Sequence, residues 1–243
     1  MNATPETLPV TQPDASEALS QAISAQCAKL ELAVSPEVAV RLAAYAASLW
    51  QWNERLNLTR HTDVEKFVSR DVADAVAICP HLATAERVLD VGTGGGVPGV
   101  LLAILRPDLR VELSDSVGKR ARTVATILEE IKLPLRVHSI AAQTVVTTER
   151  FDTLVVRAVA PLLKLLTWFE PLRDRYGRML IIKGPRWEEE KGEARHHGFL
   201  KGVTVRRVAS WPIRSTDNES VLLEVRARGL IESRGDRGDG GEK

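Results

Sequence analysis

The sequence predicts an α/β protein with a doubly wound, mostly parallel sheet of seven strands, preceded by an N-terminal helical section. From residue 87 onward, short apolar runs alternate with helical patterns, an order typical of parallel strands joined by crossover helices. A glycine-rich loop at residues 92–99 separates the first apolar run from the first helical pattern. The last two apolar runs have no helical pattern between them, which predicts a closing antiparallel hairpin.

Composition limits the class of protein. The 243 residues carry a net charge of +1, and 44% of them are hydrophobic and 27% charged, as in a soluble globular protein. No apolar run reaches the ~20 residues that a membrane helix needs, and no secretory signal is recognisable. Cys27 and Cys79 have neither metal-ligand nor redox spacing, which fits a reducing compartment. We therefore expect a cytoplasmic protein without a membrane or metal partner.

The elements predicted before the glycine loop are helical. Residues 1–16 have three prolines and no periodicity, so we expect a disordered leader. Ser35 and Pro36 fit the cap and first position of a helix, whose apolar residues recur at spacings of three and four as far as Trp52. The helical section is expected over residues 17–84, with helices near 17–33, 36–52 and 63–79.

The elements that follow belong to the predicted sheet. Residues 85–228 are expected to form the α/β domain, and the Gly- and charge-rich residues 229–243 a disordered tail. The predicted strands are residues 87–91, 110–114, 135–139, 152–156, 178–182, 203–210 and 219–226. The predicted helices are residues 99–106, 118–132, 161–173 and 186–197, and the hairpin turn is 214–218.

The glycine loop indicates a nucleotide-type cofactor and allows two interpretations. Residues 94–99 fit the G-x-G-x-x-G dinucleotide pattern, with Asp115 about twenty residues further on. The wider spacing from Asp90 through the glycines resembles the loop of S-adenosylmethionine-dependent methyltransferases, whose Rossmann-like fold also ends in a strand hairpin. Pro98 removes a backbone donor where a pyrophosphate would bind, which favours S-adenosylmethionine over NAD. Asp115 would accept hydrogen bonds from the ribose in either case, and an NAD-dependent oxidoreductase stays as the alternative.

Two further segments bear on the acceptor. Lys119 and Arg120 lie in the first turn of a predicted helix, where the helix dipole is already positive, so an anionic partner such as RNA phosphate is favoured over a solvated surface. The fourth strand ends at Arg157, with neither an Asn/Asp-Pro-Pro-aromatic motif nor a nucleophilic Cys. Arginine does not deprotonate and therefore cannot act as a base. This favours an acceptor that has no proton to remove, such as guanine N7. Arg157 would either position the substrate or have a purely structural role. Lys183, at the same edge of the predicted sheet, would contact either phosphate or solvent.

These segments together resemble the bacterial small-subunit ribosomal RNA guanine-N7 methyltransferases, the glucose-inhibited division protein B family. The resemblance covers about residues 52–225. It depends on Trp52-Asn53-x-x-Leu56-Asn57-Leu58-Thr59, the Asp90-to-Gly99 loop, Asp115-Ser116-x-Gly118-Lys119-Arg120, Arg157-Ala158-x-Ala160 and Lys183-Gly184. It implies a class I methyltransferase that makes 7-methylguanosine in 16S ribosomal RNA. It also implies that the RNA or the small ribosomal subunit is the partner, and we expect the enzyme to be a monomer.

Site residues are carried over by position. The expected cofactor residues are Asp90, Gly92, Gly94, Gly96, Val97, Asp115, Ala141, Ala142 and Arg157. The expected RNA contacts are Asn57, Lys119, Arg120 and Lys183. This chain departs from the family at Ile140-Ala141-Ala142, where Arg-small-Glu is usual, so only backbone contacts are implied there. That change keeps open a non-catalytic RNA-binding factor in ribosome assembly.

Overall fold

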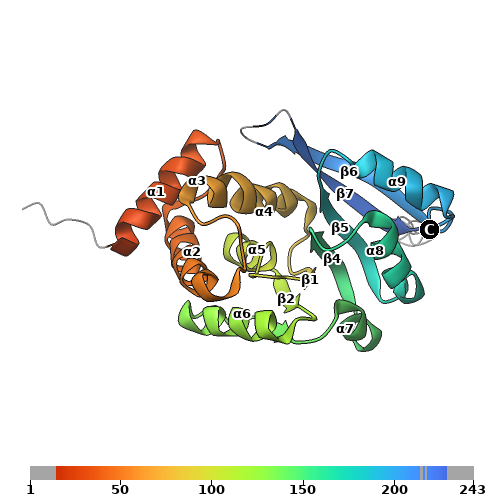
Figure 1. The fold of residues 1–243 in the computed structure, drawn as a ribbon, viewed down its shortest axis with the longest axis horizontal. Helices are drawn as coiled ribbons and strands as arrows, with labels where there is room; N and C mark the ends of the chain where they lie inside the picture. The colour runs from red at the N-terminus through yellow and green to blue at the C-terminus, as the bar shows by residue number, and fades with distance from the viewer. Residues whose placement is uncertain (1–14, 214–215, 217, 229–243) are drawn as a thin grey trace, which may run out of the picture.

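The computed structural model describes residues 15–213, 216 and 218–228, which form a sheet flanked by helices on both faces (Figure 1). The predicted tail and most of the predicted leader and hairpin turn lie outside the described residues, although Ala15 and Ser16 already belong to the first helix. The strands are β1 (Arg87–Val91), β2 (Arg110–Ser114), β3 (Arg136–His138), β4 (Phe151–Arg157), β5 (Tyr176–Lys183), β6 (Val203–Pro212) and β7 (Glu219–Ala227).

The strand order is β3-β2-β1-β4-β5-β7-β6. Strands β1 to β5 pair in parallel, while β7 runs antiparallel to both β5 and β6. This confirms the predicted doubly wound, mostly parallel sheet with its closing hairpin. The carboxyl ends of β1, β2, β4 and β5 therefore meet at one edge, where ligands of open α/β sheets bind.

The helices are close to those predicted, with two differences. They are α1 (Ala15–Lys29), α2 (Pro36–Leu56), α3 (Val64–Lys66), the π-helical turn η1 (Phe67–Val72), α4 (Ala73–Ile78), η2 (Cys79–His81), α5 (Gly99–Leu105), α6 (Gly118–Glu130), α7 (Ala142–Thr148), α8 (Leu162–Phe169), η3 (Glu170–Leu172) and α9 (Trp187–His196). Helix α7 was not predicted because its sequence is short, uncapped and rich in β-branched residues. The helix predicted over 161–173 changes to a 3-10 turn at Pro171, which has no N–H to donate.

Alternate side chains of the strands point to opposite faces and build two cores. Val88 faces the core that contains α1, α2, α4, α5 and α6, while Leu89 faces the core that contains α7, α8 and α9. The N-terminal helices thus share one core with α5 and α6 and pack directly behind the glycine loop. None of the helices in the described part of the chain is long and apolar enough to cross a membrane.

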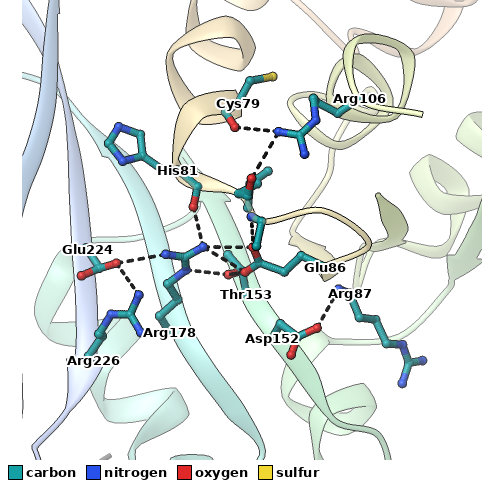
Figure 2. A network of polar contacts seen from close by, with 12 residues as sticks. Cys79, His81, Glu86, Arg87, Arg106, Asp152, Thr153, Arg178, Glu224 and Arg226 are labelled. Carbon is teal, nitrogen blue, oxygen red and sulfur yellow. Dashed lines mark hydrogen bonds and ion pairs between the residues drawn. The ribbon is translucent and has the colours of Figure 1, made fainter. Parts of the chain in front are cut away.

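A buried ion-pair network ties the strands together at the amino edge of the sheet, opposite the ligand edge (Figure 2). Glu86 accepts hydrogen bonds from Thr153 Oγ1, from Ala83 N at 2.6 Å and from Arg178 Nη2 at 3.0 Å. Arg178 Nη1 also donates to Glu224 Oε2 at 3.2 Å. Its charges are paired and largely shielded from solvent, so the loss of one partner would leave another uncompensated, and the network lies away from the ligand edge.

Replacing Glu86 with glutamine is expected to lower the free energy of unfolding by about 3 kcal/mol, because the buried Arg178 loses a charged partner. Urea denaturation at neutral pH measures the effect. The control is Glu189→Gln, which breaks an exposed pair with Arg186 and is expected to cost less than about 0.5 kcal/mol. Equal losses for the two variants would contradict the assignment.

Candidate active site

The glycine loop leaves β1 with three residues in the left-handed region: Gly92 at φ 66°, Gly94 at 59° and Gly96 at 110°. The loop is held to β2 because Thr93 N donates to Ser114 O at 2.9 Å. A Cβ at Gly94 would meet no atom within 4 Å, so the backbone there borders open space. This bare main chain is a cradle against which a cofactor can lie.

The N-terminal helices fix the back of the loop. The Tyr45 hydroxyl donates to Gly95 O at 2.9 Å, and a Cβ at Gly95 would lie 3.0 Å from Leu49 Cδ1. Tyr45 is fully buried, and burial raises the pKa of its hydroxyl, so it stays a donor. The Val97 side chain is buried in the same core, so any cofactor contact at this residue comes from its backbone.

Asp90 is buried under the loop, and one of its carboxylate oxygens has no hydrogen-bond partner among the described residues. Its Oδ2 accepts from Thr93 Oγ1 at 2.6 Å and from Gly99 N at 2.9 Å, whereas Oδ1 has no partner among the described residues. Burial raises the pKa of Asp90 to about 6. An unpaired buried carboxylate oxygen fits a cationic ligand group, and S-adenosylmethionine carries an ammonium and a sulfonium. The loop therefore fits that cofactor.

Asp115, directly after β2, faces the same loop. Its Oδ2 accepts from Gly94 N at 2.9 Å and its Oδ1 from Val117 N at 2.8 Å. Each carboxylate oxygen has a second acceptor position, so both can still receive a ribose hydroxyl. Beyond β3, Ala141 directly precedes helix α7 and Ala142 is buried, and Ser114 Oγ holds this segment by donating to Ile140 O at 2.7 Å.

Arg157, at the carboxyl end of β4, is held by two aspartates from the N-terminal helices. Its Nη1 donates to Asp71 Oδ1 at 2.7 Å and to Asp74 Oδ2 at 3.0 Å. Asp71 Oδ1 also bonds His61 Nδ1 at 2.8 Å, and Trp211 Nε1 donates to Asp74 Oδ1 at 3.0 Å. Burial disfavours the charged guanidinium, but the two carboxylates outweigh it and raise the pKa of Arg157.

The remaining donors of Arg157, Nε and Nη2, have no partner among the described residues. A cavity of about 530 Å³ lies against Arg157 at the carboxyl ends of β4 and β5. Its lining includes His61, Arg70, Asp74 and the turn that follows Arg157. That turn begins with Ala158 at φ 56°, an unusual conformation for a residue with a side chain, of the kind that clusters at functional sites.

Lys183 has a different role from the predicted RNA contact. Its Nζ donates to Ala160 O at 2.7 Å and pairs with Glu190 Oε2 at 2.7 Å, and its side chain is only 11% exposed. Glu190 Oε2 also accepts from Leu162 N at 2.7 Å. Lys183 therefore fixes the turn after β4 from inside the protein. Asn57, Lys119 and Arg120, the other predicted RNA contacts, are exposed.

The site contains four residues that the sequence analysis did not single out. They are Asp71, Asp74, His61 and Trp211. One signal was present: Asp71 and Asp74 stand three residues apart among the buried apolar residues of the same helical segment. A carboxylate on a buried helix face needs a cationic partner, but the spacing does not say which.

Comparison with known proteins agrees with this geometry. The family described as GidB, rRNA small subunit methyltransferase G, matches residues 39–216. The chain belongs to this family. Ribosomal RNA small subunit methyltransferase G of Rhodopirellula baltica is 45% identical over 193 residues, which are 79% of this chain and 84% of the relative. The protein of the same name from Chlorobium chlorochromatii is 33% identical over 71% of this chain and 77% of its own length.

A solved structure resembles this methyltransferase G chain in fold. The human methyltransferase 10 domain containing protein superposes with a TM-score of 0.50 and 15% identity, over 76% of this chain and 97% of that one. The shared part is the fold alone. The predicted family and the methyltransferase fold are thus confirmed.

We expect this methyltransferase G chain to bind S-adenosylmethionine more weakly as the pH falls through about 6. The raised pKa means that Asp90 takes up a proton in that range and loses the charge that a cationic ligand meets. Calorimetric titrations between pH 5 and 8 measure the dependence, and Asp90→Asn is the control. A pH dependence of binding that survives in Asp90→Asn would contradict this role.

Proposed function

We propose that this chain transfers a methyl group from S-adenosylmethionine to N7 of a guanine in 16S ribosomal RNA. Membership of the methyltransferase G family supports methyl transfer to small-subunit ribosomal RNA. The observation that carries the N7 assignment is the acceptor cavity, whose carboxylates are already engaged by cations. Asp74 pairs with Arg157 and Glu190 with Lys183. Neither carboxylate is available as a base, His61 of the same lining is already bonded to Asp71 through Nδ1, and N7 has no proton to remove.

Different residues would bind the cofactor and orient the acceptor base. Gly94 and the loop would hold the cofactor, with Asp115 on the ribose and the free oxygen of Asp90 toward its cationic groups. Bound S-adenosylmethionine supplies an activated methyl group. Arg157 would orient the guanine by donating to its O6, which leaves the N7 lone pair free to take the methyl group. Catalysis would then rest on positioning and on the exclusion of water.

The test is methylation of ribosomal RNA taken from a strain that lacks this gene. Incubation with the protein and labelled S-adenosylmethionine should yield 7-methylguanosine, assayed on naked 16S RNA and on small subunits. Label at another atom or no label would overturn the proposal. Tight binding of NAD without S-adenosylmethionine would favour an oxidoreductase. Cofactor binding without turnover on any ribosomal particle would favour an assembly factor.

Lys119 and Arg120 are proposed to contact RNA phosphate, since both are exposed at the start of α6, where the helix dipole makes cations costly. The double variant Lys119→Glu with Arg120→Glu is expected to raise KM for RNA about tenfold and to flatten its salt dependence, with kcat little changed. The control is Lys201→Glu, an exposed lysine before β6. Equal effects in both variants would argue against a local RNA contact.

We also propose a monomeric, cytoplasmic enzyme. Both cysteines are free, with Cys27 buried and Cys79 half-buried, as suits a reducing compartment. Light scattering in the presence and absence of S-adenosylmethionine measures the oligomeric state, and a dimer at assay concentration would overturn the first part. Fractionation of cells measures the second.

A further inference from the structure

Arg157 carries one positive charge but is paired with two carboxylates. One guanidinium meets two aspartates, Asp71 at 2.7 Å and Asp74 at 3.0 Å, and both side chains are almost fully buried. Arg70 lines the same cavity, makes no ion pair among the described residues and is free to meet a phosphate of the substrate. The group formed by Asp71, Asp74 and Arg157 therefore has a formal net charge of −1 by itself, and His61 also contacts Asp71.

Asp71 is a buried carboxylate with one oxygen that has no hydrogen-bond partner among the described residues. It is 0% exposed, and the oxygen in question is Oδ2. Leaving a buried carboxylate oxygen unpaired costs free energy, so stability alone does not explain it. Asp71 lies in the π-helical turn η1, a type of irregularity that is frequent at functional sites. The helix is thus distorted where it presents this carboxylate to Arg157.

The proposed reaction creates a charge that such a cluster would stabilise. The N7 lone pair forms the new N7–CH3 bond while the S–CH3 bond breaks, and that electron pair stays on sulfur. The sulfonium becomes a neutral thioether, no proton is released, and the positive charge moves to the guanine ring. Preorganised groups of opposite charge lower the barrier where charge develops.

We propose that Asp71 and Asp74 are positioning residues that hold Arg157 against the acceptor base and leave a negative charge there, which favours the cationic 7-methylguanine. His61 bonds Asp71 Oδ1, the same oxygen that accepts from Arg157, whereas Trp211 donates to Asp74 Oδ1, the oxygen that Arg157 does not contact. This inference rests on the proposed function. It distinguishes Asp71 from a purely structural ion-pair residue, because its charge should affect the chemical step rather than substrate binding.

The test is Asp71→Asn, which keeps the shape and removes the charge. Single-turnover methylation of RNA is expected to slow about 10- to 100-fold, because the transition state loses a negative charge that lies behind Arg157. KM for RNA and Kd for S-adenosylmethionine are expected to stay within about threefold. A rate equal to wild type, or a loss seen only in KM, would overturn the inference.

Two controls separate the outcomes. Glu86→Gln removes a buried, arginine-paired carboxylate at the opposite edge of the sheet (Figure 2), and should lower stability without slowing the reaction of the folded protein. If it fails to fold, Asp152→Asn replaces it, since Asp152 accepts only from Arg87 N at that edge. If the wild-type protein forms no 7-methylguanosine, the proposed function is wrong. If the wild-type protein is active and Asp71→Asn is equally active, only this inference is wrong.

Discussion

Replacing Arg157 with alanine is expected to lower methyl transfer at least about 100-fold and the free energy of unfolding by about 3–5 kcal/mol. The activity falls because the guanidinium that borders the acceptor cavity is gone. The stability falls because Asp71 and Asp74 stay buried without their cation. Methylation assays and urea denaturation at neutral pH measure the two losses.

The two losses should separate in a triple variant. Arg157→Met combined with Asp71→Asn and Asp74→Asn replaces the ion pairs with neutral groups of similar size, so most of the stability is expected to return. Activity is not expected to return with it, because the guanidinium that orients the guanine is missing. Recovery of activity together with stability would show that Arg157 is only structural.

Replacing Gly99 with alanine is expected to reduce the affinity for S-adenosylmethionine at least about 100-fold and to cost about 3 kcal/mol of stability. The added Cβ would overlap Leu113 Cδ2 and lie 2.7 Å from Asp90 Oδ2. The clash would push helix α5 from the strands and break the hydrogen bond from Gly99 N to Asp90. Calorimetry with the cofactor and thermal unfolding measure the two effects.

The matched controls are two other glycines. At Gly192, inside helix α9, a Cβ meets nothing within 4 Å, so alanine should stabilise the helix by about 0.5–1 kcal/mol. At Gly94 the space is also open, but the φ of 59° makes alanine cost about 1–2 kcal/mol. If Gly99→Ala behaves like Gly192→Ala, the packing of the loop described above is wrong.

What could be predicted from the sequence is local. Ser35 and Pro36 mark the start of α2, and the structure has Ser35 Oγ accepting from Val38 N at 3.4 Å. The alternation of apolar runs and helices gave the sheet, because hydrophobic periodicity depends only on neighbours along the chain. The glycine loop was recognisable for the same reason, because the residues that allow its positive φ angles all lie within residues 92–99.

What could not be predicted depends on distance along the chain. Arg157 is 86 residues from Asp71, and Trp211 is 137 residues from Asp74, so no spacing links them. Lys183 was expected to face RNA because it ends a strand at the ligand edge. Its partner Glu190 lies on α9, whose approach to β5 depends on the packing of the whole second core. Such pairings are set by tertiary structure and need coordinates.

The hydrogen bond from Trp211 to Asp74 has a consequence for protein synthesis. The N-terminal helices and the glycine loop are made first and Arg157 follows, whereas Trp211 belongs to β6, which is made after both. Asp74, one of the two carboxylates that hold Arg157, therefore gains its bond from Trp211 only after β6 has been made, whereas His61 is present early for Asp71. A nascent chain thus carries the cofactor loop of residues 92–99 well before it carries the last described partner of Asp74.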